Sequence, residues 1–387
     1  MKRVILLIVD GWGIGAQEDA IEYGDQLAHT MGHVSEETML RLPNFEKMGL
    51  GNIATLASIP PTTSPIASYG KLREKSSGKD STTGHWELAG IVLDAPFPTY
   101  PKGFPLELIQ SFCAEIGTAG VLCNSPYSGT NVIADFGTEH IKTGFPIVYT
   151  SADSVFQIAT HEDIVPIETL YEWCDWARNN LLVGEHEVGR VIARPFKGEA
   201  PLFERISHKR HDWSAAPPKN HLVTELKNRG HKTASIGKVA DLFNGEGFDF
   251  LYPTKGNTEG IEQIKKRLRA NKEDFLFINL IDTDQLYGHR LDPVGYAEAL
   301  MEIDSALPAI MDELTGEDLL IITGDHGNDP CVQSTDHTRE FVPVLLYGKR
   351  ISARALGVRD GFSQVAVSIM DFFGYEKTFG AESLLEK

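Results

Sequence analysis

The chain has 387 residues, of which 42% are hydrophobic and 23% charged, and its formal net charge is −18 at pH 7. This length predicts two compact units, or one unit with a large insertion. The acidic excess argues against binding to nucleic acid or to an anionic membrane, although a metal ion or a few arginines can still attract a phosphate locally. No apolar run approaches the roughly 20 residues of a membrane span, and the four cysteines form no CxxC pair. We therefore expect a cytoplasmic protein with free thiols.

The first predicted element is a strand at residues 4–9, which is continuously apolar and ends at Asp10. Such runs are typical of parallel strands that are covered on both faces, and this one is too short for a signal peptide. From about residue 96 to residue 213 proline and glycine recur, and one clear helix is expected at residues 167–182. We interpret this region as an inserted cap domain of mixed helices and strands. The predicted core domain then comprises residues 1–95 and 214–387, and the cap comprises residues 96–213.

The core pattern resumes with "KTASIGKVAD" and continues with apolar runs at residues 275–281, 319–323 and 341–347, which predict further buried strands. A helix is predicted between the first two runs, because Asp292 is a favourable N-cap and Pro293 suits the first turn. Gly316 is expected to end this helix. A strand, a helix and a strand in this order predict a right-handed crossover, so the fold class is α/β.

Residues able to bind a metal follow three of the predicted strands. They are Asp10 after the first strand, Asp282, Asp284 and His289 after the second, and Asp325, His326 and Asp329 after the third, with His337 shortly beyond. Ligands of open α/β sheets bind beyond the carboxyl ends of the strands. Taken singly, each residue is more simply explained as a turn, a cap or a surface group. Together they suit Zn, Mn, Fe or Co better than calcium, and two such ions about 4 Å apart can hold both oxygens of a phosphoryl transfer.

The stretch "GKDSTTGHWELAG" at residues 78–90 places Ser81, Thr82 and Thr83 in succession. Clusters of hydroxyl residues, glycine and aspartate commonly form turns and helix caps. Next to a two-metal centre, however, one hydroxyl would become a nucleophile because a metal lowers its pKa. A helix N-terminus at this position would also provide N–H groups for a phosphate.

Three motifs together, "GKDSTTGHWELAG", "LIDTDQLYGHRLDP" and "TGDHGNDP…STDHTRE", resemble the phosphopentomutase family of metal-dependent mutases in the alkaline phosphatase superfamily. The similarity extends to "YTSADSVFQIATHEDIVP", "VGRVIARPF" and "RHDW", and so spans most of the chain. The resemblance implies an alkaline-phosphatase-like core with a mainly parallel central sheet and an inserted smaller α+β cap domain. It also implies an isomerase that interconverts ribose 1-phosphate and ribose 5-phosphate, and their 2-deoxy forms, through a phosphoserine enzyme intermediate.

The resemblance also implies the residues of the active site. Ser81, which directly follows the "GKD" aspartate, takes the nucleophile position, and Thr82 and Thr83 are left as neighbours that cap the helix. Two Mn²⁺ ions or similar divalent metals are implied, one held by Asp10, Ser81, Asp325 and His326, the other by Asp284, His289 and His337. A sugar bisphosphate such as glucose 1,6-bisphosphate is the implied activator.

Cationic side chains of the cap are interpreted as contacts to a small pentose phosphate substrate. Alternation places Arg190, Ile192 and Arg194 on one face of a predicted strand, and arginine binds phosphate through a rigid fork of donors. A solvated basic edge is the alternative, but the resemblance favours ligand contacts. The implied substrate-binding residues are Ser151, Asp153, Arg190, Ile192, Arg194, Arg205, Arg210 and Lys238. Because Lys238 belongs to the core, the substrate is expected between core and cap.

Two features depart from the family pattern. The family usually has threonine where this chain has Ser81, and an Asp-Ser pair where this chain has Asp10 and Gly11. The sequence "DGWG" resembles the metal-dependent phosphoglycerate mutases, so such a mutase, or a phosphatase on the same scaffold, is the alternative enzyme. A non-catalytic protein that uses metals for stability is the alternative outside enzymes. The oligomeric state and the native metal are left open.

Overall fold

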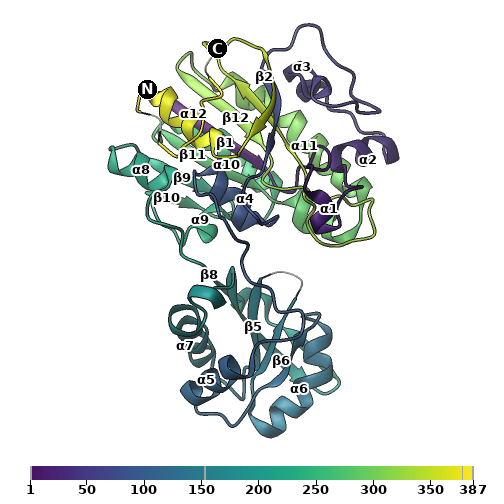
Figure 1. Cartoon of the computed structure of the whole chain (residues 1–387), viewed down its shortest axis with the longest axis vertical. Coiled ribbons are helices and arrows are strands. Elements are labelled where there is room, and N and C mark those ends of the chain that lie inside the picture. The colour runs from purple at the N-terminus through teal and green to yellow at the C-terminus, as the bar shows by residue number, and fades with distance from the viewer. Residues whose placement is uncertain (1, 152–153, 377, 386–387) are drawn as a thin grey trace. The chain divides into compact units, whose positions relative to one another are not determined.

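The computed structural model of the chain describes residues 2–151, 154–376 and 378–385. The chain forms two compact units, a larger one of residues 1–96 and 217–387 and a smaller one of residues 97–216 (Figure 1). The smaller unit is therefore an insertion between the two stretches that build the larger unit. No helix in the described part of the chain is both long and apolar enough to cross a membrane.

A sheet of eight strands forms the centre of the larger unit within the described residues, in the order β10-β9-β11-β1-β12-β13-β2-β14. Its strands are β1 (Arg3–Val9), β2 (Ser68–Arg73), β9 (Thr233–Ile236), β10 (Phe250–Tyr252), β11 (Phe275–Leu280), β12 (Asp318–Thr323), β13 (Val342–Tyr347) and β14 (Ala355–Asp360). All neighbours pair in parallel except β13, which runs antiparallel to both β12 and β2. The sheet is therefore mainly parallel, as expected.

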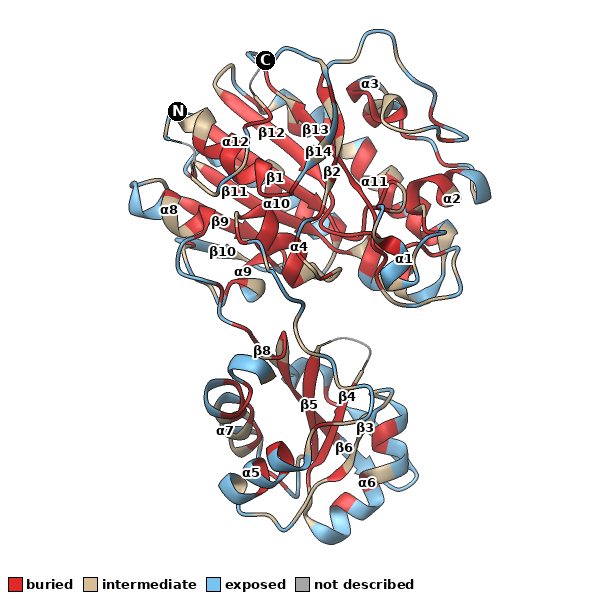
Figure 2. Ribbon diagram, in the orientation of Figure 1, coloured by how far each residue is buried: buried red, intermediate tan, exposed pale blue. Residues whose placement is uncertain are grey.

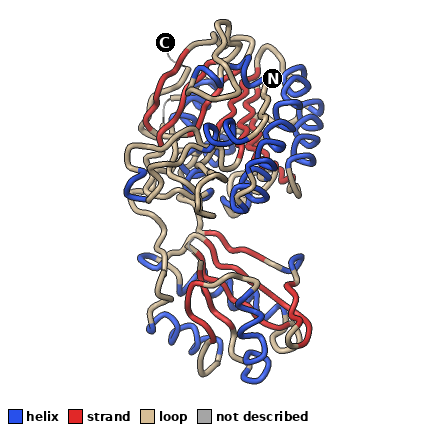
Figure 3. Tube along the Cα trace, turned by 90° about the vertical axis from the view of Figure 1, so that its right-hand side faces the viewer, coloured by secondary structure: helices blue, strands red, loops and turns tan. Residues whose placement is uncertain are grey.

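Helices cover both faces of this sheet (Figure 3). They are α1 (Ala20–Tyr23), α2 (Thr30–Glu37), α3 (Pro43–Met48), α4 (Ser81–Leu88), α8 (Leu222–Asn228), α9 (Val239–Leu242), α10 (Asn257–Ala270), α11 (Pro293–Asp312) and α12 (Gln364–Phe373). On one face, Leu7 of β1 belongs to a core with Met31 of α2 and Leu300 of α11. On the other face, His85 of α4 stacks on Phe277 of β11. Because both faces are covered, β1, β11 and β12 are buried along their whole length (Figure 2).

The smaller unit contains a mixed sheet whose described strands are β3 (Leu122–Pro126), β4 (Ile147–Thr150), β5 (Val155–His161), β6 (Arg190–Glu199), β7 (Leu202–Arg205) and β8 (His211–Ser214). Helices α5 (Leu106–Ile116) and α7 (Ile167–Trp176) contribute Phe112 and Leu170 to an apolar core that includes Phe156. Helix α6 (Asn131–Thr143) contributes Val132 to a second core with Tyr149. This unit is therefore of the α+β type.

The expected strands of the core are confirmed with one change of direction. The runs at residues 4–9, 275–281 and 319–323 correspond to β1, β11 and β12. The expectation of a parallel strand at residues 341–347 was wrong, because β13 is antiparallel to both of its neighbours. The connection between β12 and β13 contains no helix among the described residues, and parallel pairing needs a crossover connection, usually helical.

The two expected helices are also confirmed, with a different end in one case. Helix α11 begins at Pro293, where Asp292 accepts a hydrogen bond from the Gly295 N–H at 2.9 Å, but it ends at Asp312 rather than near Gly316. The helix expected at residues 167–182 is α7, extended by a π-helical turn at Ala177–Leu181.

Candidate active site and metal centre

Three neighbouring strands place carboxylates at one edge of the larger unit's sheet. Strands β11, β1 and β12 lie side by side in parallel, so their carboxyl ends meet. Asp10 directly follows β1, Asp284 lies in the π-helical turn Thr283–Tyr287 after β11, and Asp325 follows β12. The parallel pairing therefore brings these carboxylates together from distant parts of the chain.

Asp10, Asp325 and His326 form one cluster, in which one ligand-type atom of each residue lies within 4.8 Å of the others. His326 Nε2 is 3.4 Å from both Asp10 Oδ1 and Asp325 Oδ2. The opposite ring nitrogen of His326, Nδ1, lies 3.0 Å from the Gly327 carbonyl oxygen. A hydrogen bond from Nδ1 to that carbonyl leaves Nε2 directed at the two carboxylates.

Asp284, His326 and His337 form a second cluster of the same kind, and His289 adjoins it. His337 Nε2 is 3.4 Å from Asp284 Oδ1, and His289 Nε2 is 3.3 Å from Asp284 Oδ2. The Nε2 atoms of His289 and His337 are 3.2 Å apart. Because His326 belongs to both clusters, the structure brings the predicted ligands into one site without dividing them between two ions.

The charge of this site fits divalent cations. Asp10 Oδ1 is buried and has no hydrogen-bond partner among the described residues. Burial, together with the negative charges of Asp325 and Asp284, raises the pKa of Asp10. Burial acts in the same direction on Asp284, but the imidazoles of His337 and His289 outweigh it and lower the pKa of Asp284 well below its ordinary value. Buried carboxylates with an unused oxygen beside imidazoles are a donor set that divalent transition metals prefer.

Several polar side chains that the sequence analysis did not single out orient these carboxylates. Asn279 Nδ2 donates to Asp10 Oδ2 at 2.8 Å, and Asn328 Nδ2 donates to Asp284 Oδ1 at 2.6 Å. Asn279 is the one polar residue within the apolar strand β11, a signal that could have identified it. The backbone N–H of Gly11, at a φ of +74°, donates to Asp325 Oδ1 at 3.1 Å. A side chain at Gly11 would be strained at this φ, and its Cβ would lie 3.0 Å from Asn328 Cβ.

Ser81 is the first residue of helix α4, and its Oγ lies 3.0 Å from His326 Nε2. Asp80 caps the helix by accepting from the backbone N–H groups of Thr82 and Thr83 at 3.0 and 3.1 Å, and from Thr83 Oγ1 at 2.6 Å. The expectation that Thr82 and Thr83 cap the helix was therefore wrong. Because Asp80 occupies these two N–H groups, they are also not available to hold a phosphate.

Two residues of α4 hold this helix against Asp325. Gly84 approaches so closely that a Cβ there would lie 2.0 Å from the Asp325 carbonyl oxygen. His85 Nδ1 lies 2.9 Å from the Ser81 carbonyl oxygen and 3.0 Å from Asp325 Oδ2. The helix therefore presents Ser81 in a defined position beside the pair Asp325 and His326.

Two acidic residues that the sequence offers as metal ligands lie outside both clusters. Asp282 Oδ2 accepts a hydrogen bond from the N–H of Asn257 at 2.8 Å, at the start of α10. Asp329 Oδ2 accepts from the N–H of His29 at 2.9 Å and lies 2.6 Å from His33 Nδ1. Both carboxylates stabilise neighbouring segments of the chain, which was the simpler explanation for an isolated aspartate.

In the smaller unit, three of the predicted substrate-binding arginines line one cavity. Arg194, Arg205 and Arg210 surround a volume of about 240 Å³ together with Pro195, Ile206 and Ser207. Arg210 pairs with Asp212 through Nε and Nη2, at 2.7 and 2.6 Å. Asp212 neutralises only part of the charge of three guanidinium groups, so the cavity suits a phosphate group.

A buried tyrosine that the sequence analysis did not identify adjoins these arginines. Tyr149 is fully buried, and its hydroxyl has no hydrogen-bond partner in the part of the chain that the structure describes. Burial raises the pKa of Tyr149, although the charges of Arg194 and Arg205 act in the opposite direction, so the phenol remains a donor. A Cβ on Gly129 would lie 3.0 Å from this hydroxyl and 3.7 Å from Nη1 of each of the two arginines. The three groups therefore converge beside a position that glycine leaves open.

The other predicted substrate residues lie elsewhere. Arg190 is on the same strand as Arg194, with its Nη1 3.7 Å from Asp212 Oδ2, and Ile192 is buried between them. Ser151 directly follows β4, and Asp153 lies outside the described residues. Lys238 belongs to the larger unit, where it precedes α9 and its Nζ contacts Gln285 Oε1.

The fold and the site define a metal-dependent enzyme of the α/β class, and the sequence profile of the Metalloenzyme superfamily matches residues 2–377. Relatives that align with the whole chain show which family within this superfamily the chain belongs to. The chain belongs to the phosphopentomutase family and is accordingly an isomerase of the intramolecular phosphotransferase type. The resemblance found in its motifs is thereby confirmed.

Two relatives and one solved structure illustrate this similarity. The phosphopentomutase of Acetivibrio thermocellus is 47% identical over 387 residues, which cover 100% of this chain and 99% of that protein. The phosphopentomutase of Deinococcus radiodurans is 48% identical over 376 residues, which cover 96% of each chain. A crystal structure of Leishmania mexicana phosphoglycerate mutase has a TM-score of 0.51 at 13% identity and covers 99% of this chain and 97% of its own. At that identity the likeness shows the fold alone.

Proposed function

We propose that this chain interconverts ribose 1-phosphate and ribose 5-phosphate, and their 2-deoxy forms, through a phosphoenzyme formed on Ser81. The observation that carries the proposal is the position of the Ser81 hydroxyl. Its Oγ lies 3.0 Å from Nε2 of His326, and His326 belongs to both candidate metal clusters. Membership of the family supplies the class of reaction, and this hydroxyl supplies an atom that can accept the phosphoryl group.

In the proposed cycle, the phosphoryl group on Ser81 Oγ is transferred to the free hydroxyl of the pentose monophosphate. The P–Oγ bond breaks as a P–O bond to the sugar forms. In the net balance the proton lost by the sugar hydroxyl is taken up by Ser81 Oγ, so the products are a pentose bisphosphate and the free serine. The bisphosphate returns its other phosphoryl group to Ser81, which releases the isomeric monophosphate and regenerates the phosphoenzyme. A sugar bisphosphate such as glucose 1,6-bisphosphate would phosphorylate Ser81 at the start.

Two divalent ions, proposed to be manganese, would be bound by the two groups of ligands that the resemblance implies. These are Asp10, Ser81, Asp325 and His326 for one ion, and Asp284, His289 and His337 for the other. Bound ions of this kind lower the pKa of a hydroxyl and neutralise charge on a transferring phosphoryl group. Asn279 and Asn328 would keep the carboxylates of Asp10 and Asp284 oriented toward them.

The phosphate that is not being transferred is proposed to bind at the arginine cavity of the smaller unit. Arg194, Arg205 and Arg210 offer guanidinium donors there, and Tyr149 offers a hydroxyl donor beside them. Charge-assisted hydrogen bonds to phosphate are shorter and stronger than neutral ones. Ser151, Asp153, Arg190, Ile192 and Lys238 remain proposed contacts to the substrate.

The proposal is tested by assay of the purified, bisphosphate-primed protein against ribose 5-phosphate, glucose 6-phosphate and 3-phosphoglycerate in parallel. Peptide mass spectrometry of the primed protein locates the phosphate. We expect turnover of the pentose phosphate and phosphate on Ser81. Faster turnover of 3-phosphoglycerate would instead favour the alternative suggested by "DGWG" at residues 10–13. Bound metal without turnover of any of the three would favour a non-catalytic protein.

A further inference from the structure

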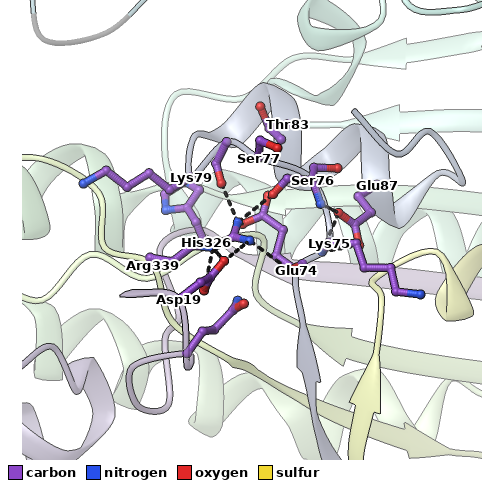
Figure 4. Close-up of polar contacts among 12 residues, drawn as sticks. Asp19, Glu74, Lys75, Ser76, Ser77, Lys79, Thr83, Glu87, His326 and Arg339 are labelled. Atoms are coloured by element: carbon purple, nitrogen blue, oxygen red, sulfur yellow. Dashed lines mark hydrogen bonds and ion pairs between the residues drawn. The ribbon is translucent and has the colours of Figure 1, made fainter. Parts of the chain in front are cut away.

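The connection from β2 to α4, residues 74–80, leads directly to Ser81 but forms neither helix nor strand. Its carbonyl groups are bound by side chains from other segments (Figure 4). Arg339 Nη1 donates to the carbonyl oxygens of Ser76 and Gly78 at 2.7 and 2.6 Å, and Nη2 donates to that of Glu74 at 3.0 Å. One guanidinium group therefore binds three carbonyl groups on the path of the chain into the proposed nucleophile.

This guanidinium is buried and its charge is compensated. Arg339 is 2% exposed, its Nη1 lies 2.9 Å from Glu74 Oε2, and its Nη2 lies 2.9 Å from Asp19 Oδ2. The ring centroid of Tyr23 lies 5.0 Å from the guanidinium carbon. Arginine has five N–H donors in a planar fork, whereas lysine has a single ammonium group. A lysine at position 339 keeps the charge but cannot reach the same acceptors together.

Glu87 of α4 binds backbone N–H groups, rather than carbonyl groups, of the same connection. Its carboxylate accepts from the N–H groups of Lys75 and Ser76, at 3.0 and 2.6 Å, and from that of Phe362 at 2.8 Å. Glu87 thus satisfies N–H groups of the connection, and Arg339 satisfies carbonyl groups. The hydrogen bond described for the Ser81 hydroxyl is to His326 and to neither of these side chains.

Arg339 also links this connection to the loop that carries His337. The backbone N–H of Arg339 donates to Asp25 Oδ2 at 2.9 Å, and the same oxygen lies 3.0 Å from Lys79 Nζ. Lys79 Nζ lies 3.1 Å from Asp336 Oδ2 as well. Since Lys79 is two residues before Ser81 and Asp336 directly precedes His337, one network holds the proposed nucleophile and a proposed metal ligand together.

We infer that Arg339 is a positioning residue for phosphoryl transfer, which fixes Ser81 relative to the His337 loop without touching the reacting atoms. The inference rests on the proposed role of Ser81 as nucleophile. A displacement of about 1 Å in a reacting group can cost roughly 100-fold in rate. A residue that sets this position therefore changes kcat and the rate of Ser81 phosphorylation, whereas a residue that only stabilises the fold changes neither.

Arg3 provides a matched control at the start of β1, the end of that strand opposite Asp10. It is also 2% exposed, its Nη1 donates to the Leu268 carbonyl oxygen at 2.7 Å, and its Nη2 lies 2.6 Å from Asp318 Oδ2. Arg3→Lys therefore removes a guanidinium that is as buried as that of Arg339, but at the end of β1 that is far from the site. It is expected to lower the free energy of unfolding while keeping kcat.

Arg339→Lys is expected to lower the rate of Ser81 phosphorylation by glucose 1,6-bisphosphate, and kcat on ribose 5-phosphate, by roughly 10- to 100-fold. KM and bound metal, measured on the same preparation, should stay near the wild-type values. In Arg339→Ala, added guanidinium at a non-denaturing concentration should restore part of kcat, and methylammonium should not. If Arg339→Ala does not fold, the comparison of the two lysine variants decides the matter.

The possible failures are distinguishable. A wild-type protein that forms no phosphoserine at position 81 contradicts the proposed function. A wild-type protein that forms it, together with an Arg339→Lys variant phosphorylated at the same rate, overturns the positioning role alone. A kcat loss equalled by Arg3→Lys, or accompanied by an equal loss of bound metal, also overturns that role.

Discussion

The two units of the chain contain polar clusters of opposite charge. In the larger unit, the carboxylates of Asp10, Asp284 and Asp325 are buried among imidazoles at the end of a parallel sheet. In the smaller unit, Arg194 and two further arginines line a cavity. Each cluster includes a buried polar atom without a hydrogen-bond partner among the described residues, Asp10 Oδ1 in one and the Tyr149 hydroxyl in the other.

We expect this contrast to separate the chemistry of the reaction from the recognition of the substrate. A buried polar group without a partner costs stability, so both clusters keep a cost that a bound ligand would remove. The carboxylate cluster suits cations, and the arginine cavity suits an anion. The three aspartate residues are each at most 7% exposed, whereas Arg205 and Arg210 are exposed. We therefore expect the larger unit to determine kcat and the smaller unit to determine substrate affinity.

The strongest test of this contrast is Ser81→Ala. Loss of a catalytic nucleophile costs about 10⁴-fold or more in kcat, and phosphoenzyme should disappear while ribose 5-phosphate still binds. Thr82→Ala is the matched control, because it removes the adjacent hydroxyl. The helix cap remains, since Asp80 binds the backbone N–H of residue 82. Ser81→Thr keeps the oxygen and should retain activity. Radiolabelled bisphosphate and peptide mass spectrometry measure the phosphoenzyme, and label that persists in Ser81→Ala would place the nucleophile elsewhere.

The next largest effect is expected at the metal ligands. Asp284→Asn should lower metal affinity by more than the roughly 10- to 100-fold typical of residues that only orient ligands. Asp282→Asn, two residues earlier, should keep the metal, because Asp282 instead binds the N–H of Asn257. Elemental analysis of both variants, and chelation followed by addition of Mn²⁺, measure the effect. Activity that survives complete chelation would contradict a two-metal mechanism.

The sequence predicts those features of the two clusters that have a signal in neighbouring residues of the chain. Strands β1, β11 and β12 are continuous apolar runs, and the residues at their ends belong to recognisable motifs. Strand β2 was not predicted, because "SYGKLR" is mostly polar and only alternate residues are buried. The strand that leads toward Ser81 therefore had no clear signal in the sequence.

Two kinds of feature leave no pattern in the sequence and could not be predicted from it. They are side-chain contacts to distant backbone groups and the lack of a hydrogen-bond partner for a single side chain. Arg339 acts through carbonyl oxygens of a distant segment, and any residue type has such a carbonyl. Tyr149 lies within the apolar strand "IVYT", where it resembles an ordinary core residue. Its unsatisfied hydroxyl becomes evident only when β4 is placed beside Arg194 and Gly129.

A smaller effect, on affinity, is expected at the arginine cavity. Arg194→Met removes a charged hydrogen-bond donor, which should cost about 1.5–3 kcal/mol, or roughly 10- to 150-fold in kcat/KM on ribose 5-phosphate. Bound metal should remain, and so should the amount of phosphoserine reached with saturating glucose 1,6-bisphosphate, because the reacting groups are unchanged. Lys197→Met, on the same strand but exposed and outside the cavity lining, is the control. Equal losses in both variants would indicate that general positive charge, rather than this cavity, attracts the substrate.

The smallest expected effect is the most specific. Tyr149→Phe removes a buried hydroxyl that has no partner in the described chain, so the free energy of unfolding should rise slightly or stay unchanged. If this hydroxyl donates to the substrate phosphate, the affinity for ribose 5-phosphate should nevertheless fall by about 2- to 10-fold, the value of a single hydrogen bond.

Tyr171→Phe is the matched control for this variant, because the Tyr171 hydroxyl already donates to the Lys209 carbonyl oxygen at 2.7 Å. Loss of that bond should lower the free energy of unfolding by about 1 kcal/mol and leave substrate affinity unchanged. Urea unfolding should therefore detect a loss in Tyr171→Phe only, and equilibrium binding should detect a loss in Tyr149→Phe only. A Tyr149→Phe protein that loses stability but not affinity would mean that its hydroxyl supports the fold, and the smaller unit would then recognise phosphate through its arginines alone.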